Sequence, residues 1–288
     1  MPSAAYSSAM SLTVEADLDA LAGLLVSARN VLVLTGAGMS TDSGIPDYRG
    51  ADGARRVTPV QYREFVRSAA VRRRYWARAF VGWRRFSTVG PNAGHRAIAR
   101  LQSVGALGAV ITQNVDGLHQ AADSRDVVEL HGTLAAVVCL ACGASSRRAS
   151  LDARTRELNP NFRPGGRAIR PDGDIELAET DIASFVVPRC LCCNSDLLKP
   201  DVVFFGDSVP KSRVTHCCAL TDAADALLVL GSSLRVYSGY RFVRRAAERG
   251  IPVAIVTRGP SRGDPTATVR LDAALGQVLP TLAERLAA

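Results

Sequence analysis

The sequence contains almost no lysine and no long apolar segment. Lys199 and Lys211 are its only lysines, and the other 33 basic residues are arginine. We attribute this bias, together with heavy alanine usage, to genomic base composition rather than to function. No run approaches the roughly 18 apolar residues that a membrane-spanning helix requires. The sequence therefore predicts no membrane span.

The start of the chain also lacks the marks of a secretory leader. Met1 to Ser11 is small and rich in Ser and Ala, without a basic start or an apolar core, so we expect a cytoplasmic protein. Seven cysteines, an odd count, then favour metal ligation and free thiols over disulfides. An apolar content of 47% over 288 residues predicts one main folded domain with an insertion.

Acidic residues are scarce in one part of this basic chain. The net charge is +8, and Arg55 to Arg100 holds twelve arginines against a single acid, Glu64. Such a run can be a solvated helical face or a surface that binds nucleic acid or an acidic partner. Both interpretations stay open at this point.

Short apolar runs recur along the chain and predict parallel strands. The five runs are Asn30–Leu34, Ala109–Thr112, Val127–Leu130, Ala226–Leu230 and Val253–Val256. Glycine or small polar residues follow each run. Because ligands of an open doubly wound sheet bind beyond the carboxyl ends of its strands, these followers converge on one edge. The pattern predicts a Rossmann-like α/β domain.

The first of these runs leads into Gly36-Ala37-Gly38, followed by small hydroxyl residues. Glycines permit a close approach of bare backbone N–H groups to a phosphate, and the N-terminus of a following helix favours negative charge. Thr41 replaces the third glycine of the dinucleotide-binding fingerprint, so the loop alone is a weak signal.

Two segments interrupt the alternation of strands and helices. Residues 50 to 91 show an Arg- and aromatic-rich helical pattern, and Cys139 to Cys193 is bounded by paired cysteines. Two Cys-x-x-Cys pairs, Cys139/Cys142 and Cys190/Cys193, suit a closed, structural tetrahedral zinc site. Cys192 competes with Cys193, but the spacing favours Cys193.

Polar groups that could bind a carboxamide, and a potential base, follow two further strands. Gln113-Asn114-Val115-Asp116 offers amide and carboxylate groups. His131, at the end of the next run, could act as a general base near neutral pH. A lone histidine is more often structural, but this one is placed on the same edge as the glycine loop.

These blocks together resemble the sirtuins, the NAD-dependent protein-lysine deacylases. The order of the family's motifs is kept: Gly36-Ala37-Gly38, continuing to Ser43-Gly44-Ile45-Pro46-Asp47-Tyr48-Arg49; Gln113 to Asp116; His131-Gly132; the four cysteines; Phe205-Gly206-Asp207; and Gly231-Ser232-Ser233-Leu234. The match extends over residues 20 to 280. Details such as Val236-Tyr237-Ser238-Gly239-Tyr240 resemble the class II branch, which contains mitochondrial sirtuin four. The absence of a transit peptide then favours a bacterial relative.

The resemblance implies a division into domains and a set of ligands. Residues 12–138 and 194–288 would form the NAD-binding Rossmann-like domain, with a helical insertion at about 51–92, and residues 139–193 would form the zinc-binding module. The implied cofactor-binding residues are Gly36, Ala37, Gly38, Ser40, Thr41, Gly44, Asp47, Tyr48, Arg49, Gln113, Asn114, Val115, Asp116, Gly231, Ser232, Ser233 and Gly259.

The resemblance also implies a reaction. The pyrophosphate of NAD would lie on the glycine loop, and Asn114 and Asp116 would hold the nicotinamide carboxamide. The acyl-lysine oxygen would attack the ribose, and His131 would activate a ribose hydroxyl against the resulting imidate. The products would be nicotinamide, O-acyl-ADP-ribose and free lysine. A protein substrate would add as a strand between the Phe205-Gly206-Asp207 loop and the segment after Leu234.

The acyl group is the least determined part of this prediction. Tyr75 and Arg78 resemble the Tyr-x-x-Arg pair with which some sirtuins hold succinyl and malonyl groups, and an Arg guanidinium pairs well with a carboxylate. The pair favours an acidic acyl group, with acetyl or lipoyl as alternatives. Its spacing can also be an accident of an Arg-rich helix.

Two residues depart from the family pattern, and two other functions stay open. Thr257 stands where an Asn often contacts the adenosine ribose, and Ser238 stands at a position that is commonly Pro. Mono-ADP-ribosyl transfer to proteins would use the same residues. A NAD-sensing protein with little catalysis is a third possibility, against which the intact His131, Asn114 and Asp116 argue.

Overall fold

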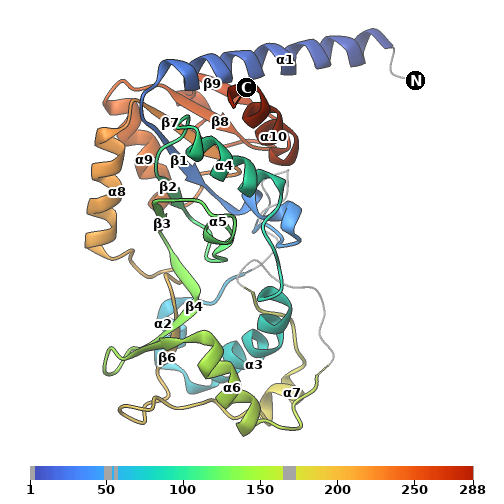
Figure 1. Cartoon of the computed structure of the whole chain (residues 1–288). Helices are drawn as coiled ribbons and strands as arrows, with labels where there is room; N and C mark the ends of the chain where they lie inside the picture. Colours follow the sequence, from blue (N-terminus) through green and yellow to red (C-terminus); the bar gives the residue numbers. More distant parts are fainter. Residues whose placement is uncertain (1–3, 49–53, 55–57, 165–172, 288) are drawn as a thin grey trace.

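The computed structural model describes residues 4–48, 54, 58–164 and 173–287. Two lobes are visible, a larger one around a parallel sheet and a smaller one to which β4 leads (Figure 1). In the part of the chain that is described, no helix is long and apolar enough to cross a membrane. Arg49 falls outside the described residues.

A six-stranded parallel sheet forms the centre of the larger lobe. Its strands, in spatial order, are β3 (Val127–Glu129), β2 (Val110–Thr112), β1 (Val31–Thr35), β7 (Ala226–Leu230), β8 (Val253–Val256) and β9 (Val269–Leu271). The five predicted strands are all present, within one residue at each end. The sixth, β9, was not predicted, because its three residues include an arginine and give no apolar run.

Alternate residues of the central strands face two separate helical layers. Val31 and Val33 pack with α1 (Ala4–Ser27), α4 (Ala93–Ser103) and α10 (Leu275–Leu286). Leu32 and Leu34 pack against α8 (Lys211–Ala223) and α9 (Tyr237–Glu248) on the other face. Burial on both faces explains why these strands are continuous apolar runs. The Rossmann-like α/β fold is therefore confirmed.

The segment after β1 differs from the expectation of a helix that points its N-terminus at the ligand. Two single 3-10 turns, η1 (Ala37–Met39) and η2 (Thr41–Ser43), stand there instead. Gly44 then adopts a left-handed conformation with φ +87°, and Pro46 follows. A left-handed residue and a proline both end helical structure, so the phosphate-binding expectation loses the helix dipole on which it partly rested.

The smaller lobe joins the two insertions around one core. Its antiparallel sheet has the order β5 (Ser145–Arg147), β4 (Gly132–Cys139), β6 (Leu198–Val202). Its helices are α2 (Tyr62–Arg67), α3 (Ala69–Phe86), α6 (Arg148–Leu158) and α7 (Glu179–Ala183). Phe65, Trp76 and Phe80 pack in the same cluster as Val137 and Phe185. The aromatic helices and the cysteine module therefore share one hydrophobic core. The remaining short elements, α5 (Leu118–Ala121) and η3 (Asp264–Thr266), belong to the larger lobe.

Arginines of the basic run contribute to this core rather than forming one solvated face. Arg72 is 7% exposed, pairs with Asp196 at 2.7 Å, and donates to the carbonyls of Phe65 and Val66. Arg74 forms an ion pair with Glu179 of α7. Part of the positive charge thus ties α3 to the cysteine module.

Candidate active site

A cavity of about 1020 Å³ opens at the carboxyl ends of the parallel strands, and both lobes line it. From the larger lobe it is lined by residues that the sequence predicted for the cofactor: Gly36, Ala37, Gly38, Ser40, Thr41, Asp47, Tyr48, Gln113, Asn114, Val115, Asp116, Gly231, Ser232 and Ser233. His131, the predicted base, lines it as well. Of the predicted cofactor residues that are described, Gly44 and Gly259 do not line it. Segments up to 197 residues apart thus meet as the sheet topology requires.

The glycine loop after β1 packs directly against the turn at the end of β7. Gly36 N–H donates to the carbonyl of Leu230, and Gly38 N–H donates to that of Gly231. A Cβ on Gly38 would lie 2.9 Å from Gly231 Cα. Two of the three backbone N–H groups predicted to face a phosphate are therefore already bonded, and of Gly36, Ala37 and Gly38 only Ala37 keeps its N–H for a ligand.

Amide side chains after β2 are fixed by hydrogen bonds to the loop after β1. Asn114 Nδ2 donates to the Gly36 carbonyl at 3.1 Å and to Ser40 Oγ at 3.0 Å. Ser40 Oγ in turn donates to Asp116 Oδ2 at 2.6 Å. Burial raises the pKa of Asp116, while the bonds from Ser40 and from the Leu118 N–H oppose that shift. These side chains are held in place before any ligand is bound.

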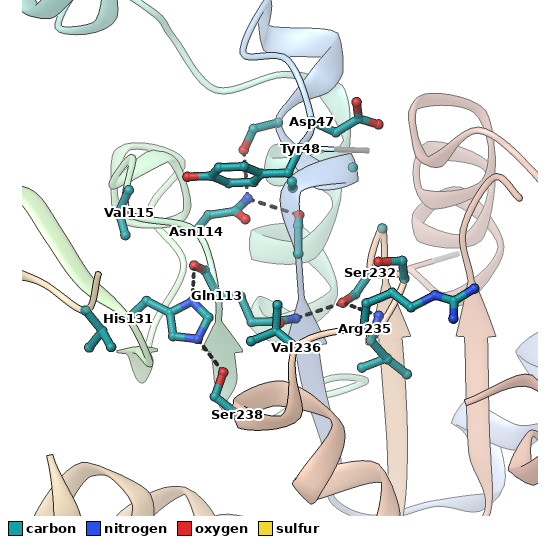
Figure 2. A pocket seen from close by; sticks show the side chains of 18 of the residues that line it. Asp47, Tyr48, Gln113, Asn114, Val115, His131, Ser232, Arg235, Val236 and Ser238 are labelled. Atoms are coloured by element: carbon teal, nitrogen blue, oxygen red, sulfur yellow. Dashed lines mark hydrogen bonds between the residues drawn. The ribbon is translucent and has the colours of Figure 1, made fainter. Parts of the chain in front are cut away.

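His131 lies at the centre of the cavity wall, between Gln113 and Ser238 (Figure 2). Its Nδ1 is 2.9 Å from the Gln113 carbonyl oxygen, and its Nε2 is 2.8 Å from Ser238 Oγ. Burial lowers the pKa of His131, and the Arg213 charge adds to this, whereas the bond to Gln113 opposes it. A lowered pKa keeps the imidazole neutral at physiological pH, as a general base must be.

Of the two residues predicted to hold the acyl group, only Tyr75 lines the cavity, packed edge-to-face on Phe65 at a centroid distance of 5.4 Å. Arg78, one helical turn later, is not among the lining residues, and its Nε is buried without a hydrogen-bond partner. Acyl binding by this pair stays a prediction.

The predicted peptide-binding loop is already paired on one side. Phe205 and Gly206 both line the cavity. The Phe205 carbonyl accepts a hydrogen bond from the Tyr62 N–H, and Gln61 and Phe205 form a parallel bridge. Strand addition of a substrate beside this loop stays a prediction, and this carbonyl is already occupied.

Sequence analysis missed the apolar wall that the smaller lobe contributes. Val60, Leu134, Val202 and Phe204 line the cavity beside Tyr75. Val60 and Leu134 belong to no chemistry-bearing motif, and Val202 and Phe204 lie in the segment that leads into the Phe205-Gly206-Asp207 loop. The strands that carry Leu134 and Val202, β4 and β6, gave no strand signal. Only the alternation of buried residues along β4 could have indicated that face.

Four cysteines meet at the far end of β4. The sulfurs of Cys139, Cys142, Cys190 and Cys193 all lie within 4.8 Å of one another. The Cys139–Cys193 and Cys142–Cys190 pairs are 3.6 and 3.7 Å apart, close to the roughly 3.8 Å edge of a tetrahedron with Zn–S bonds of about 2.3 Å. The donor set fits zinc, and Cys192 stays outside it.

Comparison with known proteins agrees with this site. Residues 36–238 match the family model described as the Sir2 family. The NAD-dependent protein deacetylase 1 of Streptomyces coelicolor is 55% identical over 260 residues, which cover 90% of this chain and 87% of that protein. The human mitochondrial NAD-dependent protein lipoamidase sirtuin-4 is 46% identical over 258 residues, covering 88% of this chain and 82% of that protein.

Solved structures give the same relationship. A chain from work on the mechanism and regulation of Sir2 enzymes superposes with a TM-score of 0.74 at 30% identity, covering 95% of this chain and 98% of that one. A second, Sir2Af2 bound to a myristoylated histone peptide, has a TM-score of 0.68 at 27% identity, covering 94% and 97%. With its parallel sheet, its four-cysteine cluster and its motifs arranged around one cavity, the chain belongs to the Sir2 family, the sirtuins.

Proposed function

We propose that this sirtuin is an NAD-dependent protein-lysine deacylase that prefers neutral, extended acyl chains to acidic ones. The observation that carries the proposal is the position of His131, a half-buried base in a cavity with polar groups on one side and an apolar wall on the other. The Streptomyces and human relatives carry the corresponding activities in their names.

The polar side of the cavity fits a dinucleotide. Ala37 has an available N–H, Ser232 and Ser233 line the far part, and a Cβ at Gly36 would meet Ser232 within 2.9 Å. Both Nδ2 hydrogens of Asn114 are already used, so Asn114 Oδ1 and the Asp116 carboxyl group are the groups that would accept hydrogen bonds from a carboxamide NH2. Bound NAD would supply the ADP-ribosyl group to which the acyl group is transferred, and His131 would remove a proton from a hydroxyl at its Nε2.

The apolar side argues for the acyl preference. The cavity-lining residues from the smaller lobe and the start of the loop after it are uncharged: Pro59, Val60, Tyr75, Leu134, Val202, Val203, Phe204, Phe205 and Gly206. The loop then contributes an acid, Asp207, and the first lining cation after it is Lys211 of α8 in the larger lobe. The lining arginines that the structure describes, Arg235, Arg241 and Arg258, all come from the larger lobe. A carboxylate placed against the smaller lobe would lose water without gaining a described cation, which is costly.

The proposal is tested with one peptide that carries acetyl-, octanoyl-, lipoyl- or succinyl-lysine, incubated with NAD. We expect octanoyl- or lipoyl-lysine to give kcat/KM at least about tenfold above succinyl-lysine, since burying a carboxylate without a partner exceeds 1.4 kcal/mol. His131→Ala should remove acyl transfer from all four peptides. Faster turnover of succinyl-lysine, abolished by Arg78→Met, would restore the Tyr75–Arg78 interpretation. Labelled ADP-ribose found on protein, with no deacylated peptide, would favour ADP-ribosyl transfer.

A further inference from the structure

Ser238 makes a contact that the proposed reaction does not require. It lies in the first turn of α9, and its hydroxyl is 2.8 Å from Nε2 of His131 (Figure 2). The two residues are 107 positions apart in the sequence. Ser238 also lines the cavity, so the contact lies at the working end of the imidazole.

Hydrogen-bond chemistry fixes the direction of this contact. The Gln113 carbonyl oxygen, 2.9 Å from Nδ1, can only accept, so Nδ1 carries the proton of the neutral ring. Nε2 then holds the lone pair and accepts a hydrogen bond from the Ser238 hydroxyl. The ring is thus held at both nitrogens, with the basic nitrogen covered by a hydroxyl.

The surrounding backbone is shaped to allow this contact. Gly239 lies directly on Gln113, where a Cβ would stand 2.5 Å from Gln113 Oε1. Gln113 itself is fixed by bonds from its Nε2 to Ser232 Oγ at 2.8 Å and to the Thr35 carbonyl at 3.2 Å. One residue, Gln113, therefore positions both the first turn of α9 and the Nδ1 side of His131.

We propose that Ser238 is a positioning residue for His131, whose hydroxyl keeps the imidazole in the Nδ1–H tautomer with Nε2 directed into the cavity. The inference rests on the proposed function for its consequence, but the contact itself is a property of the free protein. Because Nε2 has a single lone pair, the Ser238 O–H turns aside when a substrate hydroxyl donates there, and after the proton has moved to Nε2 the Ser238 oxygen accepts a hydrogen bond from the new N–H. A rotation about one bond thus serves both protonation states of the base.

The first test reads the contact without any substrate. The 15N signals of the His131 ring are recorded at pH 7.5 in the wild-type protein, in Ser238→Ala and in Ser238→Thr. We expect the Nδ1–H tautomer in the wild type, a downfield move of the unprotonated Nε2 signal in Ser238→Ala, and a wild-type signal in Ser238→Thr. Identical ring signals in all three proteins would overturn the proposal.

The second test separates the step that uses the base from the step before it. Exchange of labelled nicotinamide into NAD reports the first step, and O-acyl-ADP-ribose formation reports the step that needs His131. Ser238→Ala should slow product formation about fivefold, as expected for one lost neutral hydrogen bond, and leave exchange within about twofold. Ser238→Thr should restore product formation.

Three other outcomes of these experiments would count against the proposals. Product formation in Ser238→Ala that equals or exceeds the wild-type rate would overturn the positioning role. Equal losses in the Ala and Thr variants would assign the effect to the helix terminus rather than the hydroxyl, and would also overturn it. If the wild-type protein releases no nicotinamide from any acyl peptide, the proposed function fails, while the ring signals still decide whether the contact exists.

Discussion

Gly132 follows the candidate base, and the backbone structure explains why the His131-Gly132 pair contains a glycine. Its φ is +82°, and a Cβ there would lie 1.9 Å from the Asp201 carbonyl oxygen. Gly132 begins β4 and pairs with Val202 of β6, and the Val203 N–H donates to the His131 carbonyl. The glycine of the His-Gly pair thus lets β4 and β6 pair closely immediately beside the base.

Replacing Gly132 with alanine should therefore destabilise the fold by more than the strain of an alanine at positive φ accounts for. We expect Gly132→Ala to lower the free energy of unfolding by at least about 2 kcal/mol more than Gly143→Ala, since the added Cβ must displace backbone. Gly143 is the matched control, with φ +75° and open space around its Cα. Urea unfolding measures both variants, and equal losses would contradict the steric explanation.

At the scale of elements, the cysteine cluster and helix α3 belong to one structural unit. Cys139 and Cys190 are buried in the same cluster as Trp76 and Phe80 of α3. The Trp76 indole N–H donates to the Leu198 carbonyl of β6, and Arg148 stacks on both Trp76 and Trp83. Because a structural zinc site contributes directly to folding, losing the metal should loosen the helices as well as the cysteine turns.

Zinc removal should accordingly be visible from the tryptophans. Both tryptophans of the chain are in α3, so a zinc chelator should shift their fluorescence emission to the red, and added zinc should reverse the shift. Cys193→Ser should produce the same red shift without a chelator.

Cys192→Ser is the matched control for that variant. Cys192 is exposed and adjacent to Cys193, but it lies outside the cluster, so its replacement should leave the emission unchanged. An unshifted spectrum after full metal removal, verified by metal analysis, would mean that α3 is independent of the zinc site.

At the scale of the whole molecule, two buried histidines tie the helical layer to the sheet. His95 of α4 and His119 of α5 lie 4.9 Å apart between ring centroids and are 0% and 1% exposed. His119 Nε2 is 3.0 Å from Thr35 Oγ1 of β1. Burial lowers the pKa of His95 to about 3 and that of His119 to about 4. Both are neutral in the folded protein at neutral pH.

These histidines should make the fold sensitive to mild acid. Each folded pKa lies below the unfolded value of 6.5, so the unfolded chain binds more protons as the pH falls. Their stabilisation is complete above pH 6.5 and is lost towards pH 4 and 3. As the pH falls from 6.5 to 5, each of the two histidines should lower the free energy of unfolding by roughly 1.5 kcal/mol.

Urea unfolding at several pH values measures this loss. His119→Gln keeps a donor for Thr35 and should flatten the pH dependence by about that amount. His216→Gln, at an exposed histidine of α8, should leave the slope unchanged. A wild-type slope in His119→Gln would show that this histidine is not the source of the acid sensitivity.

The α/β class, five of the six strands of the main sheet and the order of the motifs along the shared edge could all be predicted from the sequence. They could be predicted because buried parallel strands are recognisable as local apolar runs, and topology then places their carboxyl ends together. The four cysteines were likewise recognisable from spacing within two tight turns. Each of these features depends on residues that are close together in the sequence.

Tertiary structure decided what depends on contacts between distant segments. The union of two insertions in one core, the use of the Gly36 and Gly38 N–H groups by the β7 turn, and the absence of Arg78 from the cavity wall follow from packing. Ser238 appeared in the sequence only as a departure at a position that is commonly Pro. Its hydroxyl reaches His131 because α9 begins at the carboxyl end of β7 with Gly239 against Gln113, a juxtaposition that no local pattern encodes.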